Sequence, residues 1–312
     1  MSGHSRPMRY GFKLLAAALL LLSTACHVTR PGDGSTDQAR LRVLTYNVLY
    51  VFDHGKGVEA GSAWIREQAP DIVALQELTN ISPERLTELA AGWNHEHSAL
   101  LTTSGFSVGL TSSHPIEVLE RIEGDLHHGC LHARVEGIHL FVVHLSPFRW
   151  EVRQREADLL LPRIEPLLEQ GRDVLVLGDF NALSPADRAL LEAQPELLAK
   201  HRASDAEHAH VENLRDDHFD YSVMERFLDA GLQDAVLPSI KASDASRWTF
   251  PTGIWSEDKA TAPTGGSRID FILASPSVAS TVAAAAIPRE GVVNRTSDHY
   301  PVLVDLLLRS AP

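Results

Sequence analysis

Residues 174–182 read VLVLGDFNA and join a short apolar run to a turn that carries an acid and an amide. The branched apolar residues of 174–177 are typical of a buried strand. Glycine, aspartate and asparagine end such a strand and leave polar side chains at its edge. This stretch therefore predicts a strand that delivers Asp179 and Asn181 to one edge of a sheet.

Outward from this stretch, apolar strands alternate with amphipathic helices from Leu41 onward, with no repeat or low-complexity block. We expect strands over 41–48, 72–76, 107–111, 131–135, 138–145, 174–177, 268–274 and 300–308. We expect helices over 58–68, 83–91, 151–169 and 221–230. Ser82 and Pro83 are a helix-start signal, whereas Pro162 and Pro166 are expected to break or bend the third helix. The pattern predicts one α/β domain over residues 41–312.

Polar residues stand at other strand ends too, where an apolar residue would ordinarily continue the ladder. They are Asn47, Glu77, His144, Asp270, and Asp298 with His299. Each has an ordinary structural explanation when taken alone. Asn47 could cap a turn, His144 could be a core imidazole, and Asp179 with Asn181 could form an Asx-turn. Asp270 lies within an apolar run and needs a partner, because a lone buried carboxylate is costly.

Six motifs built on these residues occur in a fixed order along the chain. They are Thr45-Tyr46-Asn47-Val48, Leu75-Gln76-Glu77, Val143-His144-Leu145, Gly178-Asp179-Phe180-Asn181-Ala182, Arg268-Ile269-Asp270-Phe271-Ile272 and Ser297-Asp298-His299-Tyr300-Pro301. The series resembles the endonuclease/exonuclease/phosphatase superfamily, the DNase I-like metal-dependent phosphoesterases, from Leu41 to the C-terminus. The resemblance implies an α/β fold with a four-layer sandwich of two mixed β-sheets flanked by helices. Its site would lie at one end, where loops from both sheets converge.

The chemistry of a phosphate ester supports a metal site among these residues. Its oxygens repel a nucleophile, so a catalyst must neutralise their charge and hold water in line. The oxygens of Asn47, Glu77 and Asp298 are hard ligands that suit Mg²⁺, with Mn²⁺ as a plausible substitute. These motifs contain no cysteine, which argues against structural zinc.

The resemblance also implies roles for the remaining site residues. Asp270 would orient the ring of His299 and fix its tautomer, which supplies the partner that Asp270 needs. Asp179 would orient the attacking water, and Asn181 would donate to a phosphoryl oxygen. His144 would contact the phosphate and assist the leaving group. Members of the superfamily divide the acid and base roles differently.

Charge and composition bear on the substrate. The chain has 28 Lys+Arg against 41 Asp+Glu, a formal net charge of −13. An acidic protein is unsuited to coating a phosphate backbone, although a cleft can be locally basic. Ser113 also stands where many members carry a cation. We therefore expect a small-molecule or phospholipid diester rather than DNA. The alternatives are an exported nuclease, or a lipoprotein that binds a phosphoryl ligand without catalysis.

The first 25 residues indicate export. Three cations precede the apolar run of 14–22, and small residues follow it ahead of Cys26; this is the pattern of a secretory signal. The stretch before Cys26 resembles the lipobox of bacterial lipoproteins, which implies lipidation at Cys26. The alternative is a soluble secreted protein cut near Ala25. Residues 26–40 have the composition of a flexible tether. We expect a membrane-anchored lipoprotein, periplasmic or at the cell surface, without an obligate protein partner.

Two further segments have open interpretations. Residues 201–218 carry four histidines among five acids, and could form a Zn²⁺-binding insertion or, as we prefer, a solvated loop. Stoichiometric Zn²⁺ uptake through this segment would instead indicate a metal-handling lipoprotein. Trp248, Phe250 and Trp255 lie in a Gly/Pro/Thr-rich region that could be a recognition loop, although packing under a long surface loop is the preferred interpretation.

Overall fold

A computed structural model of the chain describes residues 39–103, 105–240, 245–256 and 265–308. The expected signal segment, Cys26 and nearly all of the expected tether lie outside the described residues. Within the described part, no helix has both the length and the apolar character needed to span a membrane.

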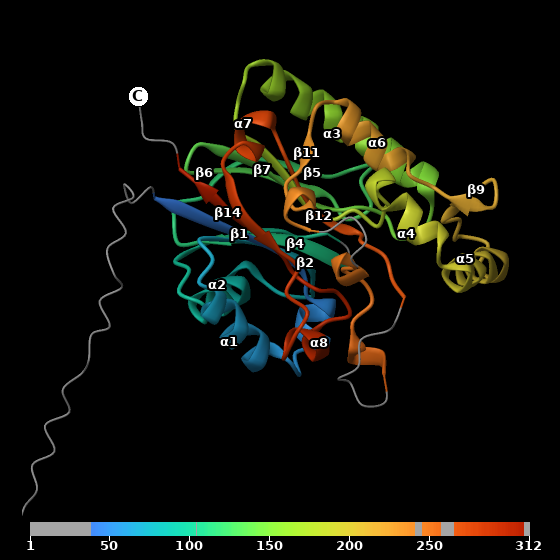
Figure 1. Cartoon of the computed structure of the whole chain (residues 1–312). Helices are drawn as coiled ribbons and strands as arrows, with labels where there is room; N and C mark the ends of the chain where they lie inside the picture. The colour runs from blue at the N-terminus through green and yellow to red at the C-terminus, as the bar shows by residue number, and fades with distance from the viewer. Residues whose placement is uncertain (1–38, 104, 241–244, 257–264, 309–312) are drawn as a thin grey trace, which may run out of the picture. The chain divides into compact units, whose positions relative to one another are not determined.

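Two mixed six-stranded sheets form the centre of the domain (Figure 1). The first sheet has the order β13 (Val282–Ala286), β14 (Val302–Leu307), β1 (Arg40–Asn47), β2 (Ile72–Thr79), β4 (Phe106–Ser112) and β3 (His97–Leu101). The second has the order β11 (Gln233–Asp234), β12 (Asp270–Ala274), β8 (Val174–Asp179), β7 (Ile138–His144), β6 (Cys130–Val135) and β5 (Glu117–Ile122). In each sheet one central pair is parallel, β1 with β2 and β7 with β8, and the other pairs are antiparallel.

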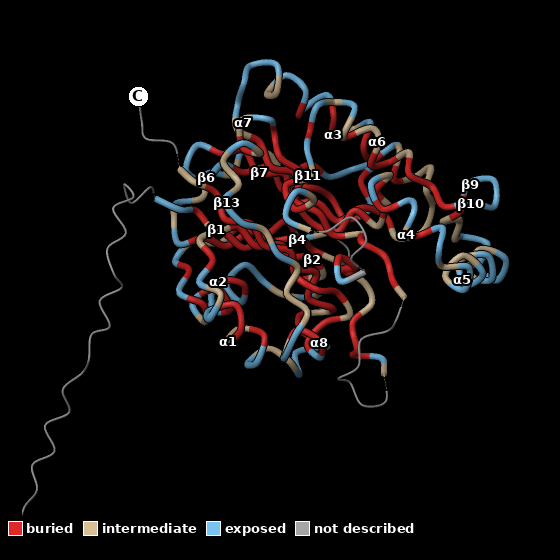
Figure 2. The backbone as a smooth tube through the Cα atoms, viewed as in Figure 1, coloured by how far each residue is buried: buried red, intermediate tan, exposed pale blue. Residues whose placement is uncertain are grey.

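The two sheets enclose an apolar layer, and helices cover their outer faces. Alternate residues of the strands, such as Val43, Ala74, Val142 and Leu177, form the cluster between the sheets. Helices α1 (Val58–Gln68) and α2 (Pro83–Ala91) pack on the first sheet. Helices α3 (Trp150–Glu169) and α6 (Ser222–Asp229) pack on the second. Figure 2 shows the buried strands between helices whose outer faces are exposed. The expected sandwich of two mixed sheets flanked by helices is confirmed.

An insertion between β8 and α6 adds a small separate cluster. It comprises η2 (Pro185–Asp187), α4 (Arg188–Glu192), α5 (Pro195–Glu207) and the hairpin of β9 (Leu214–Arg215) with β10 (His218–Phe219). Leu191 of α4 and Phe219 of β10 pack with Trp248, which lies outside the insertion. The remaining short elements are η1 (Leu49–Asp53), η3 (Leu237–Ser239), η4 (Ala245–Arg247), η5 (Gly253–Trp255), α7 (Pro276–Ala279) and α8 (Val293–Thr296).

One expectation about local structure is wrong, and another is wrong in part. Helix α3 runs unbroken through Pro162 and Pro166, which were expected to break or bend it. A proline removes one backbone hydrogen bond from a helix, but Leu160 and Ile164 bury their side chains and hold this helix on the second sheet. The histidine-rich segment expected as a loop is helical up to Glu207 and then forms the hairpin. Helix α5 has no buried residue, so its sequence carries no apolar period.

Candidate active site

The polar residues at the strand ends continue the apolar face that lies between the sheets. On β8, Leu175 and Leu177 face this layer, and Asp179 follows them on the same side. On β1, Asn47 follows Leu41 and Val43 in the same way. The apolar layer therefore ends in acids, amides and imidazoles at one edge of the sandwich.

Strand register brings the key residues of the second sheet into one row. His144 of β7 is the register partner of Asp179, and Asp179 is the register partner of Asp270 on β12. In the first sheet Asn47 pairs with Gln76, next to Glu77. The parallel pairs end at this edge while the antiparallel neighbours begin there, so residues far apart in sequence become adjacent.

Two backbone features shape this edge. Gly178 has a φ of +142°, and a Cβ on it would lie 1.9 Å from the carbonyl oxygen of Val143. Only glycine permits such a close approach of β7 and β8. Glu77 has a φ of +60° where the register between β2 and β4 shifts. This bulge redirects the Glu77 side chain away from the simple alternation of the strand.

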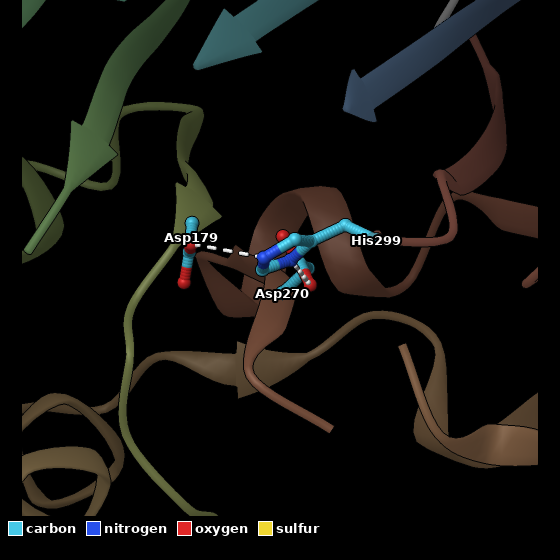
Figure 3. A group of neighbouring side chains, drawn as sticks. All are labelled: Asp179, Asp270 and His299. Atoms are coloured by element: carbon cyan, nitrogen blue, oxygen red, sulfur yellow. Dashed lines mark hydrogen bonds and ion pairs between the residues drawn. The ribbon is translucent and has the colours of Figure 1, made fainter. Parts of the chain in front are cut away.

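His299 lies between two buried carboxylates, as Figure 3 shows. Its Nδ1 is 2.8 Å from Asp270 Oδ2, and its Nε2 is 3.8 Å from Asp179 Oδ2. Burial lowers the pKa of His299, but the charges of Asp270 and Asp179 outweigh it and raise the pKa well above its usual value. The structure thus gives Asp270 the partner that its burial requires.

Asp179 is buried to 1% exposure and has three polar neighbours in the site besides His299. Asn47 Nδ2 donates to it at 3.0 Å and the backbone N–H of Asn181 donates at 2.8 Å. His144 Nε2 lies 3.6 Å from the same carboxylate. Burial, together with the negative charge of Asp270, raises the pKa of Asp179 to about 7. A carboxyl group with this pKa can accept or release a proton near neutral pH.

His144 is held as a neutral ring. It is buried and stacks on His128 with 4.0 Å between the ring centroids. Burial and the neighbouring histidines lower its pKa well below the usual value. His128 Nδ1 also bonds the backbone oxygen of His144 at 3.1 Å. In the sequence, residues 127–130 could line the substrate cleft or form a turn before the strand of 131–135, and nothing local distinguishes the two.

The three residues expected to bind a metal lie at the same edge. Asn47 Nδ2 donates to Glu77 Oε1 at 3.3 Å, and the charge of Asp298 contributes to a raised Glu77 pKa whose main cause is burial. Asp298 Oδ1 is buried and has no hydrogen-bond partner among the described residues. A cation would satisfy this oxygen and offset the two acids, so the carboxylates fit a hard divalent ion. Asn47 turns its Nδ2 toward Glu77, while its Oδ1 accepts from the N–H of Leu49 at 3.2 Å, so a metal beside Glu77 would require this amide to rotate.

Asn181 joins the site to a cavity of about 970 Å³. Its Nδ2 donates to the backbone oxygen of Leu145 at 3.0 Å, which leaves the second amide hydrogen available. The cavity extends from Asn181 and His299 to α5 and is also lined by Phe250 and Trp255. Trp255 is 66% exposed, and Phe250 lies against the His299 ring in a tilted arrangement with 5.0 Å between the ring centroids, whereas Trp248 is buried. Trp248 therefore packs, in line with the preferred interpretation, whereas Phe250 and Trp255 line the cavity.

The loop after His144 is fixed by two residues of α3 that sequence analysis missed. Glu156 accepts from the N–H groups of Ser146 and His127, at 2.8 Å and 2.7 Å. Arg153 donates from Nη1 to the oxygen of Ser146 at 2.9 Å. Both side chains are buried, but in the sequence they are two charged residues in a helix with many others. Only the fold distinguishes them.

Comparison with known proteins matches these observations. The model of the Endonuclease/Exonuclease/phosphatase family matches residues 44–299. Among curated proteins, none matches this chain in sequence.

Three similar solved structures illustrate the fold. An AP endonuclease from Archaeoglobus fulgidus is 18% identical with a TM-score of 0.61, covering 85% of this chain and 98% of its own. A 3′ phosphatase from Neisseria bound to a product DNA hairpin is 17% identical with a TM-score of 0.61, covering 85% and 99%. An endonuclease/exonuclease/phosphatase from Bacteroides vulgatus is 18% identical with a TM-score of 0.59, covering 87% and 100%.

Proposed function

The chain belongs to the endonuclease/exonuclease/phosphatase family, and we propose that it is an exported, Mg²⁺-dependent hydrolase of phosphate esters. The observation that carries the proposal is the buried group of Asp179, Asp270 and His299 at the edge of the sandwich. Hydrolysis requires a water to attack phosphorus, the ester P–O bond to break, and the leaving oxygen to gain a proton. The site contains a group suited to each proton transfer.

Asp179 would accept the proton of the attacking water, and His299 would donate a proton to the leaving oxygen. The pKa of Asp179, raised to about 7 by burial, suits a carboxylate that orients water and takes its proton. The raised pKa of His299 keeps its ring protonated, so its Nε2 can donate to a phosphoryl or leaving oxygen. Asp270 holds the ring through its bond to Nδ1 and fixes the tautomer once Nε2 has given up its proton. His144 and Asn181 would donate neutral hydrogen bonds to the phosphoryl group.

Glu77 and Asp298 would hold the Mg²⁺ ion, with Asn47 as a third ligand after its amide rotates. When bound, the ion supplies positive charge that neutralises the phosphoryl oxygens. Mn²⁺ has similar preferences and would substitute for it. The orphaned Asp298 Oδ1 supports this assignment. The ligand roles of these three residues stay predictions.

We favour a compact substrate, a small-molecule or phospholipid diester. The cavity beside His299 is large enough to enclose a small organic group, and the chain is acidic overall. Two structurally similar proteins, an AP endonuclease and a phosphatase bound to DNA, keep an exported nuclease as the second candidate. A binding lipoprotein without catalysis is the third.

Export and anchoring are proposed from the N-terminal sequence alone. Lipidation at Cys26 would hold the domain at a membrane, periplasmic or at the cell surface. Metabolic labelling with an alkyne fatty acid tests this. Label should appear on the wild-type protein and be absent from Cys26→Ala, which should leave the membrane fraction. Equal labelling of the two would contradict lipidation at Cys26.

A substrate panel tests the function. The full-length protein would be assayed with Mg²⁺ or chelator on plasmid DNA, RNA, phospholipids, phosphosugars and a chromogenic diester, with His299→Ala in parallel. We expect products from small esters or phospholipids that require both the metal and His299. Nicked plasmid as the main product would favour the nuclease. A folded, metal-bound protein without turnover on any class would favour the binding lipoprotein.

A further inference from the structure

Arg153 is a buried cation whose hydrogen-bonding capacity is mostly unused. It lines the cavity beside the site, although only 3% of it is exposed. A guanidinium group has five N–H donors. Nη1 donates to the oxygen of Ser146 and Nη2 to Asn213 Oδ1, each at 2.9 Å. Nε is buried without a partner.

Arg153 also has no carboxylate partner among the residues that the structure describes, which sets it apart from the other buried arginines. Arg247 and Arg268 both form ion pairs with Asp187. Nearby carboxylates raise the pKa of Arg153, namely those of Asp220, Glu156, Asp179 and Asp205, but none of them forms an ion pair with it among the described residues. Burial has the larger effect and lowers this pKa to about 10, so the group is charged at neutral pH. A buried charge that no carboxylate contacts directly is costly.

The hydrogen bonds by which Arg153 holds the neighbouring loop do not explain why a charged residue is buried here. The two bonds that Arg153 makes go to a backbone carbonyl and a side-chain amide, and a neutral donor such as glutamine could form bonds of the same kind. The cavity supplies another explanation, because Lys200 of α5 lines it as well and is exposed. Two cations, together with the acids Glu196 and Asp220, therefore border a space that begins at the reactive histidine.

We propose that this cavity is a second anion subsite, in which Arg153 and Lys200 bind a carboxylate or phosphoryl group carried by the part of the substrate that is not hydrolysed. The substrate is then a compact phosphate ester with a second negative charge. This rests on the proposed phosphoesterase function, which places the scissile phosphate near His299. Buried guanidinium groups bind carboxylate and phosphoryl oxygens more strongly than neutral acceptors.

Binding of stable analogues tests the subsite without turnover. The probes are alkylphosphonates of several spacer lengths that end in a carboxylate, a second phosphonate or a neutral carboxamide. The full-length protein in detergent with Mg²⁺ would be titrated by calorimetry. At the best spacer length we expect an anionic end to bind about tenfold tighter than the carboxamide. The carboxylate and phosphonate series show which anion is preferred.

Variants assign the preference to its residues. Arg153→Gln should remove most of the preference for an anionic end, whereas Arg155→Gln, at an exposed position of the same helix, should keep it. Because Arg153→Gln could impair folding, Lys200→Gln at the exposed rim is the second variant and should reduce the preference severalfold. Equal affinity of wild type for charged and neutral ends would overturn the subsite.

Hydrolysis measured in parallel separates the two proposals. Turnover of a neutral-ended ester without any anion preference would overturn the subsite and leave the phosphoesterase intact. An anion preference that depends on Arg153, with no turnover of any ester, would support the subsite and contradict the hydrolase.

Discussion

At the residue scale, Asp179 belongs to the proposed active site, and its negative charge is unfavourable there because the side chain is buried. Burial raises its pKa to about 7 from a reference value of 3.8. The native state therefore binds a proton more tightly than the unfolded chain, and the associated stability is lost as pH rises from about 4 through 7. Asp179→Asn cannot titrate, so it should abolish activity yet be more stable than wild type at high pH.

The size of this effect follows from the shift. The difference in unfolding free energy should be near zero at pH 4 and grow to at most about 4 kcal/mol above pH 7, at 1.36 kcal/mol per pKa unit. Urea denaturation in chelator measures it. Asp229→Asn, at an exposed position of α6, is the control and should show little difference across the range. If Asp179→Asn were less stable than wild type at pH 8, this would contradict the inference that the buried negative charge of Asp179 destabilises the native state.

Asp270→Asn tests the pairing with His299. The carboxylate of Asp270 is the largest cause that raises the pKa of His299. Its removal should lower that pKa, so the ring loses its proton at a lower pH than in wild type. NMR titration of the His299 ring in metal-free protein measures the shift. Turnover should fall about 10²- to 10⁴-fold because the tautomer is no longer fixed. An unchanged titration would show that Asp270 does not set the charge of His299.

At the element scale, the β7–β8 pair depends on Gly178. A Cβ there would lie 1.9 Å from a backbone oxygen of β7, which must move. Gly178→Ala should destabilise the protein by several kcal/mol, as strain at a special backbone position does. Gly171 also has a positive φ, of +66°, but nothing lies within 4 Å of its added Cβ. Gly171→Ala should cost only about 1 kcal/mol. Similar losses for both in thermal melts would contradict the close approach.

A buried ion-pair group attaches the insertion to η4, to the segment just before β12 and to β11. Asp187 of η2 pairs with Arg247 and Arg268, and Arg268 also pairs with Asp234. Asp187→Asn removes the negative charge between two buried guanidinium groups and should cost about 3–5 kcal/mol. Asp217→Asn breaks the exposed pair with Arg202 and should cost about 0–1 kcal/mol. Equal effects in chemical denaturation would argue against the buried network as the main attachment.

Local signals in the sequence were sufficient to predict some helices and strands, whereas other elements carry no such signal. Helices α1 and α2 have the expected bounds, and Ser82 caps α2 by accepting from the N–H of Arg85. Helix α5 was missed because no residue of it is buried. Strand β3 was missed as well, since its pairing with β4 is a tertiary property. Apolar period predicts an element only where that element buries one face.

At the scale of the whole molecule, the motif order predicted the sandwich, and the structure brings the selected residues to one edge. Hydrogen bonds or close contacts link seven of these residues there, namely Asn47, Glu77, His144, Asp179, Asn181, Asp270 and His299. The cavity could not be predicted, because its wall combines α3, α5, the hairpin and the segment around Trp255. Only this combination of elements shows that Arg153 borders the cavity.

The most direct test of the account is the rate of phosphate-ester hydrolysis by wild type and His299→Ala, with Mg²⁺ and with chelator, on the best substrate of the panel. His299 is buried to 5% exposure, so the fold of the variant must be verified by its circular dichroism. The account predicts turnover only for wild type with metal, and a loss of about 10²- to 10⁴-fold in the folded variant. A folded His299→Ala that hydrolyses the ester at the wild-type rate would contradict it.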